Sequence, residues 1–239
     1  MKTNPEKVDI LVFGAHPDDV EWSIGGFILK MIDLGHSIGL IDLTRGEMGS
    51  KGNAEIRTSE AMEAAKRLGV TFRHQLDLGD GRLFDNHENR CVIAKIIREC
   101  KPELLLAGNP NDRHPDHSAG GLMVRNGSFL ARLQKLDLGV EWWAVNRIFY
   151  YFLHDHPKPD FITDITKWFP KKREVMKAYQ SQFYSGEFAN GYKYVGTSDY
   201  PRDIETKGQL YGALIGVDYG EPFICDRIPS VEDPFKDLK

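Results

Sequence analysis

The sequence predicts an α/β protein with a Rossmann-like, doubly wound and mostly parallel sheet that carries helices on both faces. Two observations lead to this prediction. Short, nearly continuous apolar runs recur along the first half of the chain, as expected for strands that are buried on both faces. Segments with helical periodicity separate these runs, and right-handed crossovers follow as the default connection between parallel strands.

The first half of the chain alternates regularly between the two kinds of element. Strands are expected over residues 8–15, 37–44, 71–78 and 103–108, and helices over 22–35, 54–68, 87–100 and 116–134. Gly35 and Gly69 stand where a helix commonly ends, and Asn53 stands where a side chain can cap the helix that follows it.

The second half of the chain is less regular. Its expected elements are an aromatic-rich strand at 144–153, a short strand at 161–165, a helix at 170–184, a loop at 190–200, a helix at 203–215 and a terminal edge strand at 221–225. No stretch has the composition of a linker, so we expect one domain over residues 1–239.

Composition excludes several classes of partner. The net charge of -4 argues against a nucleic-acid binder that relies on phosphate contacts. No apolar run approaches the roughly 18 residues of a membrane span, so no membrane partner is expected. The three cysteines form no Cys-x-x-Cys pair, which favours a reducing, cytoplasmic compartment. Cys91 and Cys100 fall on an expected helix, where packing is their simplest role.

Two polar clusters follow buried strands, at residues 16–21 (His-Pro-Asp-Asp-Val-Glu) and 112–117 (Asp-Arg-His-Pro-Asp-His). Ligands of open α/β sheets bind beyond the carboxyl ends of the strands, near a switch in strand order. Either cluster alone is compatible with an ordinary polar turn. Together, at the ends of two buried strands, they indicate one shared site.

The residue types in the clusters are those of a divalent metal site. His16, Asp19 and His117 would supply three protein ligands and leave a position open for water, as catalytic zinc requires. Ferrous iron accepts the same two-histidine, one-carboxylate set, so the residues leave Zn²⁺ and Fe²⁺ open. Water bound to zinc in such sites has a pKa of roughly 7, which makes a nucleophile available at neutral pH.

The remaining acids and bases of the clusters have roles in hydrolysis. Asp18 adjoins a ligand and is the candidate general base. His114 is placed to polarise a scissile carbonyl or to protonate the leaving amine. Asp116 can hold a ring nitrogen of a histidine and so fix its tautomer.

At these motifs the sequence resembles the LmbE-like, or PIG-L-like, deacetylases, which use zinc on a Rossmann-like fold to remove the acetyl group from N-acetylglucosaminyl conjugates. The resemblance is carried by Ala15-His16-Pro17-Asp18-Asp19 with Glu21 and by His114-Pro115-Asp116-His117. It continues through Thr44-Arg45-Gly46-Glu47 and Arg57-Thr58-Ser59-Glu60. It covers residues 8–223.

The resemblance implies a role for each matching residue. His16, Asp19 and His117 match the zinc ligands, and Asp18 matches the general base. His114 matches the histidine that stabilises the tetrahedral intermediate, and Asp116 the acid that pairs with it. Arg57 and Glu47 match positions expected to contact substrate.

The C-terminal part looks most like the branch of the family that serves bacillithiol biosynthesis. This likeness rests on Gly212-Ala213-Leu214-Ile215-Gly216-Val217 and Gly220-Glu221-Pro222-Phe223. It implies N-acetylglucosaminyl malate as the small-molecule amino-sugar substrate. Val20, a one-residue spacer before Glu21, occurs in the same branch. The family also implies a homo-oligomer, either a trimer or a hexamer.

Other interpretations of the sequence stay open. The same site suits another metallohydrolase chemistry, such as phosphoester or ureido cleavage, or a sugar- or nucleotide-binding module without catalysis. No Gly-x-Gly-x-x-Gly follows the first strand, which disfavours a dinucleotide site. The segment 45–52 is equally a substrate lid or a plain loop. The roles of His154 and His156 are also open, between a pocket wall and a second metal.

Overall fold

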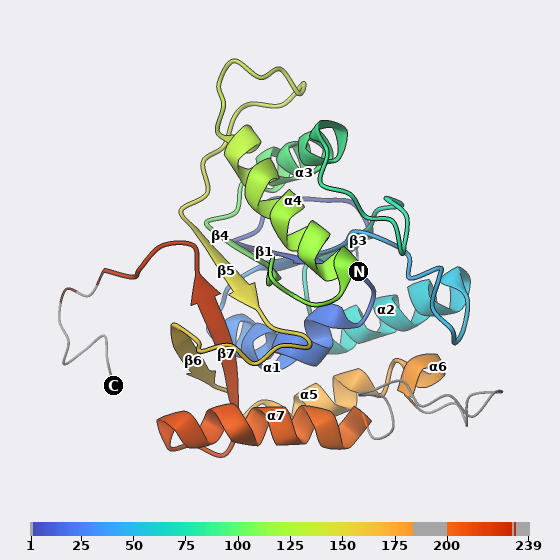
Figure 1. The fold of residues 1–239 in the computed structure, drawn as a ribbon, viewed down its shortest axis with the longest axis vertical. Coiled ribbons are helices and arrows are strands. Elements are labelled where there is room, and N and C mark those ends of the chain that lie inside the picture. Colours follow the sequence, from blue (N-terminus) through green and yellow to red (C-terminus); the bar gives the residue numbers. More distant parts are fainter. Residues whose placement is uncertain (1, 184–199, 231, 233–239) are drawn as a thin grey trace.

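The computed structural model describes residues 2–183, 200–230 and 232, and seven strands in these residues form one sheet (Figure 1). The strand order is β3-β2-β1-β4-β5-β7-β6. The strands are β1 (Ile10–Gly14), β2 (Ile38–Asp42), β3 (Phe72–Gln75), β4 (Leu104–Gly108), β5 (Arg147–Tyr151), β6 (Phe161–Asp164) and β7 (Gly220–Cys225). The predicted α/β class is confirmed.

The first five strands are parallel, as the apolar runs predicted. β7 runs antiparallel to both of its neighbours, β5 and β6. The expectation of an edge strand at 221–225 is therefore wrong, because β6 occupies the edge and β7 lies inside it. Phe223 accounts for this position: its ring packs against Phe149 of β5 and Phe161 of β6, with centroids 6.3 and 5.0 Å away.

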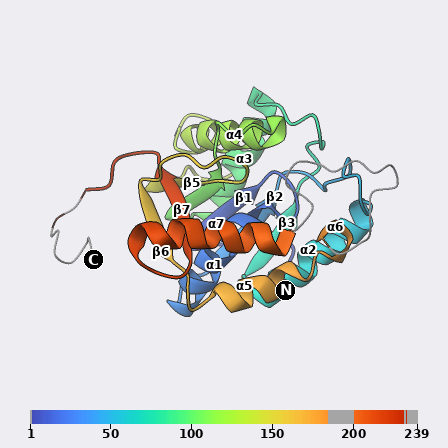
Figure 2. The ribbon, with the colours of Figure 1, turned by 60° about the horizontal axis from the view of Figure 1, so that its bottom comes forward.

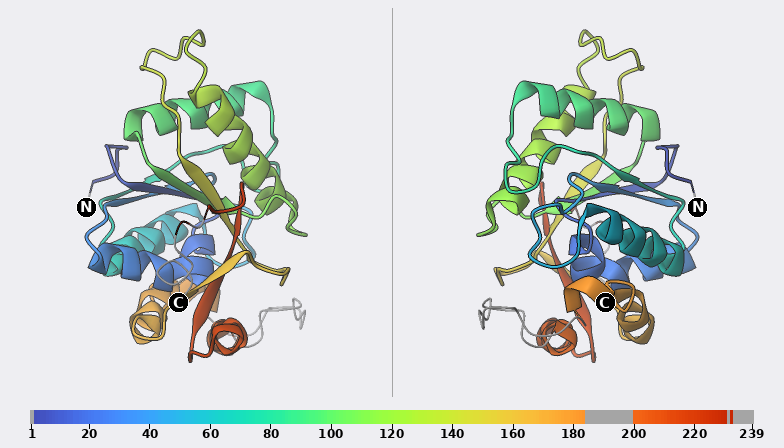
Figure 3. Two further views of the ribbon diagram at one scale, coloured as in Figure 1. Left: turned by 90° about the vertical axis from the view of Figure 1, so that its left-hand side faces the viewer. Right: turned by 90° about the vertical axis from the view of Figure 1, so that its right-hand side faces the viewer.

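Helices cover both sides of the sheet. They are α1 (Asp19–Asp33), α2 (Ala54–Leu68), α3 (His87–Cys100), α4 (Pro115–Ala131), α5 (Phe169–Met176), α6 (Gln180–Phe183) and α7 (Tyr200–Ile215). Figures 2 and 3 show α3 and α4 on one side and α1, α2, α5 and α7 on the other. The sheet is thus the middle of three layers.

The side chains of β1 alternate between the two helical layers. Ile10 and Val12 pack into the apolar cluster with α1 and α2, whereas Leu11 and Phe13 pack into the cluster with α3 and α4. Successive side chains of a strand point to opposite faces, so a strand buried on both faces is apolar throughout.

Both ends predicted for α2 and for α3 are confirmed, whereas α1 and α7 begin three residues earlier than expected and α4 ends three residues earlier. The Asn53 side chain accepts the Ile56 N–H at 2.8 Å, and Gly69 ends α2 with φ of 86°. No helix among the described residues is long and apolar enough to cross a membrane. Cys100 is fully buried and Cys91 partly so, and both are free thiols.

The helix expected at 170–184 is two helices, α5 and α6, separated by a turn at residues 177–179. The turn buries Tyr179, whose hydroxyl donates to Glu21 at 2.9 Å beneath the candidate site. Residue 184 and most of the expected loop at 190–200 lie outside the described residues.

Candidate active site

The two polar clusters meet where the sequence predicted, at the carboxyl ends of β1 and β4. These neighbouring parallel strands are the switch point of the sheet, because β2 continues on one side of β1 and β5 on the other side of β4. His16 follows β1 directly and Asp19 begins α1, while Pro115 begins α4. Proline is favoured at a first helical position, so His114-Pro115 fixes the start of α4 beside the site.

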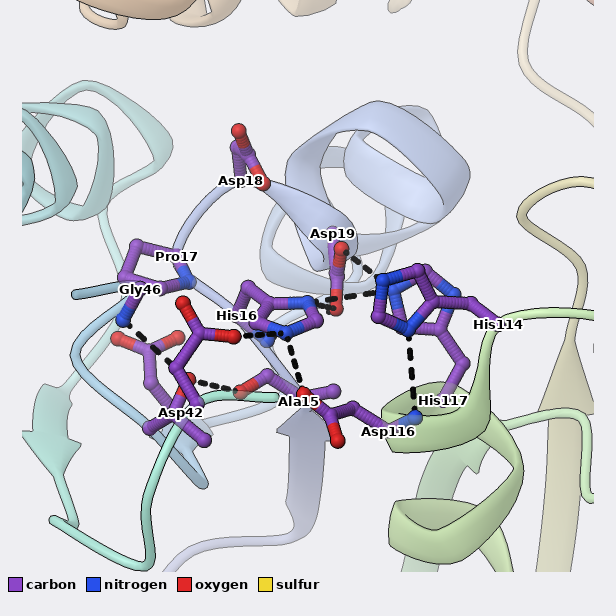
Figure 4. A network of polar contacts seen from close by, with 12 residues as sticks. Ala15, His16, Pro17, Asp18, Asp19, Asp42, Gly46, His114, Asp116 and His117 are labelled. Atoms are coloured by element: carbon purple, nitrogen blue, oxygen red, sulfur yellow. Dashed lines mark hydrogen bonds and ion pairs between the residues drawn. The ribbon is translucent and has the colours of Figure 1, made fainter. Parts of the chain in front are cut away.

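His16, Asp19 and His117 converge on one point (Figure 4). His16 Nδ1 lies 3.2 Å from His117 Nε2. The two Asp19 oxygens lie 3.5 Å from His16 Nδ1 and 3.4 Å from His117 Nε2. All three side chains are buried. The three predicted ligands are therefore brought together from the turn after β1, from α1 and from α4.

This donor set fits a divalent metal ion. Two nitrogens bound to one tetrahedral zinc at roughly 2.0–2.1 Å stand about 3.4 Å apart, close to the observed separation of 3.2 Å. Imidazole nitrogens and a carboxylate oxygen are ligands that both zinc and iron accept.

The excess of negative charge in the site also favours a bound cation. Carboxylates surround the two histidines, namely Asp18, Asp19, Asp80, Asp112 and Asp116. Burial lowers the pKa of His16, but Asp19, Asp116 and Asp80 together raise it well above its ordinary value. Such an excess of buried negative charge is costly without a positive partner.

Carboxylates hold the outer nitrogen of each ligand histidine. His16 Nε2 lies 3.2 Å from Asp116 Oδ2 and 3.0 Å from Asp80 Oδ1. His117 Nδ1 lies 3.3 Å from Asp112 Oδ1. A carboxylate behind a metal-binding imidazole fixes its tautomer and raises its basicity.

Sequence reasoning missed Asp80 and gave Asp112 no role. Asp80 lies in the loop after β3, and its side chain is almost fully buried. The signal was present, because Gly79-Asp80-Gly81 follows a parallel strand whose carboxyl end faces the same edge as β1 and β4.

Asp116 contacts a different histidine from the one that the resemblance implies. Its carboxylate accepts the Gly81 N–H at 2.6 Å and lies against His16. His114 instead accepts the backbone N–H of Asp116 on Nδ1, at 3.2 Å. The Asp116 carboxylate thus orients His16, which agrees with its expected role of holding a histidine.

His114 is held as a neutral imidazole that can donate from Nε2. Burial and the nearby His117 and His16 lower its pKa. Because Nδ1 accepts a hydrogen bond, the proton of the neutral ring sits on Nε2. The ring stacks on His117 with centroids 4.4 Å apart, so this donor lies beside the ligand cluster.

Asp18 lies next to the cluster but outside it, with its side chain turned away from the two ligand histidines (Figure 4). Its backbone is left-handed, with φ of 103°, and its side chain remains 16% exposed. Burial raises the pKa of Asp18 to about 7, Arg57 opposes this rise and Asp19 adds to it. A carboxylate with this pKa can take and return a proton near neutral pH.

Arg57 is buried and holds the loops around Asp18. Its guanidinium donates to the carbonyls of Pro17 at 2.6 Å and Gly46 at 3.0 Å, and it lies 3.3 Å from Asp18 Oδ2. Gly46 has φ of 66°, and a Cβ there would come within 2.2 Å of Arg57. The expected substrate contact is not visible in this arrangement, which uses the guanidinium inside the protein.

Glu47 likewise has backbone partners. Its carboxylate accepts the N–H of Asp80 at 2.8 Å and that of Arg45 at 3.2 Å. This contact ties the loop after β2 to the loop that carries Asp80. Both residues that the resemblance assigned to substrate therefore connect loops in the structure.

A buried ion cluster lies beneath the site. Arg73 of β3 forms ion pairs with Glu21 and with Asp42, the latter at 2.6 Å, and all three side chains are inaccessible to solvent. Glu21 follows the ligand Asp19 by two residues, so this cluster anchors the start of α1.

His154 extends the site beyond the ligand cluster. Its Nδ1 lies 3.2 Å from Asp112 Oδ1, and its ring stacks on His117 with centroids 5.1 Å apart. His154 and His156 both line a cavity of about 280 Å³. Of the two roles that the sequence left open for them, the structure shows a place in the wall of a cavity.

An imidazole and carboxylate cluster at the switch point of an α/β sheet is the arrangement of a metal-dependent hydrolase. The model of the PIG-L family, described as GlcNAc-PI de-N-acetylase, matches residues 11–127, which include both polar clusters. Diacetylchitobiose deacetylase of Thermococcus kodakarensis is 32% identical over 189 residues, covering 73% of this chain and 70% of that protein.

Two further proteins are similar over much of the chain. A probable N-acetyl-α-D-glucosaminyl L-malate deacetylase 2 of Bacillus anthracis is 29% identical, covering 73% of this chain and 81% of its own length. The crystal structure of a conserved protein from Thermus thermophilus, TT1542, has a TM-score of 0.84 and 35% identity, covering 94% of this chain and 97% of that one.

This chain belongs to the PIG-L family of de-N-acetylases and is a hydrolase of N-acetyl amides. A hydratase from Pseudomonas putida KT2440, 20% identical with a TM-score of 0.78, shares the fold alone. The fold therefore accommodates other chemistry, and the residues of the site carry the functional argument.

Proposed function

We propose that this protein is a zinc-dependent deacetylase that releases acetate from an N-acetylglucosaminyl conjugate. The observation that carries the proposal is the convergence of His16, Asp19 and His117 with Asp18 beside them. The family description and the two deacetylases named above support an N-acetylglucosamine-type substrate. His16, Asp19 and His117 would hold the metal.

The metal, when bound, acidifies a water molecule and polarises the acetyl carbonyl. Asp18 is the group that takes the proton of the attacking water, because its pKa of about 7 leaves it partly charged at neutral pH. His114 donates from Nε2 to the oxygen that becomes negative as the tetrahedral intermediate forms. A preorganised donor of this kind is typically worth about 2.7–4 kcal/mol.

Collapse of the intermediate requires a proton on the leaving amine. Asp18, protonated in the first step, returns this proton, so acetate and a free amino sugar leave. The Asp116 and Asp80 carboxylates keep His16 in the tautomer whose Nδ1 faces the cluster. Asp112 does the same for His117, whose Nε2 faces the cluster.

For the substrate itself we favour N-acetylglucosaminyl malate. The C-terminal residues that resemble the bacillithiol branch, and the similarity to the Bacillus anthracis protein, support this choice. The higher identity to diacetylchitobiose deacetylase makes N,N'-diacetylchitobiose the second substrate to examine.

Acetate release from both compounds by the zinc-loaded protein tests the proposal, with Asp18→Asn as the matched variant. We expect turnover by the wild type and a loss of roughly 10²–10⁴-fold in the variant, which should still bind zinc. Release from diacetylchitobiose alone would keep the chemistry and change the substrate. No acetate from either compound, with zinc bound, would refute the proposal and favour phosphoester cleavage or simple sugar binding.

A further inference from the structure

A cavity of about 280 Å³ opens beside the candidate active site. Its wall combines the segment after β5, part of α7, one residue of α1 and Arg113 from the loop before α4. Its lining residues include Trp22, Arg113, Leu153, His154, His156 and Lys207. A cavity of this volume has room for a small organic substituent, since one water needs only about 10–15 Å³ by the same measure.

The cavity and the surroundings of the ligand cluster share one residue, His154. His154 forms part of its wall, and the same ring contacts Asp112 and stacks on His117. Arg113, at the exposed side of the cavity, lies between Asp112 and His114 in the chain. Both residues place the cavity wall next to the ligand cluster.

Lys207 is an unusual residue in this wall. It is only 8% exposed, and its ammonium donates to the carbonyls of Phe152 and Leu153 and lies 4.1 Å from the ring centroid of Trp22. Within the part of the chain that the structure describes, no carboxylate oxygen is placed at ion-pair distance from it. By contrast, the neighbouring buried lysine, Lys172, is 2.6 Å from Glu221.

A buried ammonium without a counter-ion is energetically costly. Burial lowers the pKa of Lys207 well below its ordinary value, and the charge of Lys172 adds to this effect. Among the described lining residues, Asp203 is the one acid against two cationic residues, Arg113 and Lys207. A negatively charged group in the cavity would supply the missing partner.

We propose that this cavity receives the part of the substrate bonded to the amino sugar, and that this part carries a carboxylate or phosphate recognised by Lys207 and Arg113. The inference rests on the proposed function and deepens it, because it names the residues that recognise the charged part of the aglycone. Charge-assisted hydrogen bonds to an anion are roughly twice as strong as neutral ones. Trp22 and Leu153 provide an apolar wall for the carbon skeleton.

The kinetic test compares acetate release from N-acetylglucosaminyl malate, its dimethyl ester and N-acetylglucosamine 1-phosphate. We expect the wild type to prefer an anionic substrate over the neutral ester by at least about tenfold in kcat/KM, the size of effect expected of one desolvated charge pair. Comparing kcat/KM for the malate and the phosphate substrates shows whether a carboxylate or a phosphate is preferred. Lys207→Met should remove the preference while ester hydrolysis changes less than about twofold.

Two further variants keep the test decisive. Arg202→Met removes an exposed positive charge from the same helix outside the cavity wall, and it should leave the preference unchanged. Arg113→Gln changes an exposed residue, so it should fold even if Lys207→Met does not, and it should reduce the preference. An equal loss on all substrates in Lys207→Met would overturn the proposal, since it would assign Lys207 to the support of the Phe152 and Leu153 carbonyls.

Binding to the metal-free protein separates this inference from the deacetylase proposal. By titration calorimetry, N-acetylglucosaminyl malate should bind at least about tenfold more tightly than its dimethyl ester, and Lys207→Met should abolish the difference. If neither compound releases acetate but this difference in affinity is present, the deacetylase proposal is refuted and the proposal about the cavity is supported. Equal binding of acid and ester would refute the cavity proposal whatever the activity.

Discussion

Lys172 Nζ lies 2.6 Å from the Glu221 carboxylate, and this buried ion pair bridges a break in α1. Ile24 leaves helical geometry, with φ of -131° and ψ of 22°, so backbone groups on either side lose their helical partners. The Glu221 carboxylate accepts the N–H groups of Gly26 and Phe27, at 3.0 and 2.5 Å. Lys172 donates to the carbonyl of Ser23 at 3.3 Å.

This pair matters for the site because the first turns of α1 carry Asp18, Asp19 and Glu21. The break lets that segment turn toward the carboxyl end of β1 while the rest of the helix packs on the sheet. Gly26 allows Ile165 and the Glu221 carboxylate to lie close to the backbone of α1, since a Cβ there would lie 2.7 Å from Ile165 and 3.0 Å from Glu221. Residues of α5 and β7 thus set the position of a candidate metal ligand.

Removing one partner of this pair should destabilise the protein strongly. Glu221→Gln leaves a buried ammonium without its counter-ion, for which about 3–5 kcal/mol of unfolding free energy is expected. The double variant with Lys172→Met should recover part of that loss. Urea denaturation measures both values. Lys167→Met, which breaks an exposed pair with Asp33, is the control and should leave the midpoint unchanged. Additive effects of the two substitutions would contradict the coupling.

Asp112 should control metal affinity without binding the metal itself. Its carboxylate contacts Nδ1 of both His117 and His154, at 3.3 and 3.2 Å. Asp112→Asn weakens the hold on the His117 tautomer, so zinc affinity should fall about 10–100-fold. Competition with a chromogenic chelator measures the affinity. Asp77→Asn, at an exposed position after β3, is the control. Unchanged affinity in Asp112→Asn would remove this role.

The parts of the fold and site that the sequence predicted are those governed by local patterns. Buried parallel strands are apolar throughout, so β1, β2 and β4 were identifiable, and the ligand loops follow directly from β1 and β4. This topology was sufficient to predict that His16, Asp19 and His117 converge. The interior position of β7 was not predicted, because it depends on aromatic contacts with strands distant in the sequence.

The partners of the site residues depend on side-chain directions, which periodicity does not specify. The residue pattern did not specify which histidine each carboxylate contacts, and Asp116 faces His16 and not His114, the partner that the resemblance implied. Arg57 was expected to face substrate because it matches a position of the family that does so, yet it is 5% exposed and bound to two carbonyls. The break between α5 and α6 follows from the burial of Tyr179, a tertiary effect.

Metal removal should lower thermal stability without unfolding the protein, because the three layers pack independently of the ligand cluster. A metal present at about 1,000 times its Kd adds about 4.1 kcal/mol to the native state. Zinc should therefore raise the Tm of the chelator-treated wild type. Asp19→Asn should lose this rise, whereas Asp18→Asn should keep it. A rise of equal size in Asp19→Asn would place the metal elsewhere.

The contact between Arg57 and Asp18 predicts a shift of the pH profile. Asp18 acts as a base only when it is charged, so kcat/KM should fall as the pH drops below its pKa. The positive charge of Arg57 lowers that pKa, and burial raises it. Arg57→Met should therefore move the acidic limb of the profile to higher pH. One unit below the pKa, only about a tenth of the base remains charged.

The same measurement distinguishes this role from substrate binding. If Arg57 contacted substrate, Arg57→Met would raise KM at every pH and leave the acidic limb of kcat in place. Arg45→Met is the matched control, because Arg45 adjoins Gly46, which Arg57 contacts, and pairs with the exposed Glu55. Its profile should coincide with that of the wild type. An acidic limb that stays fixed or moves to lower pH in Arg57→Met would show that Arg57 does not set the pKa of Asp18.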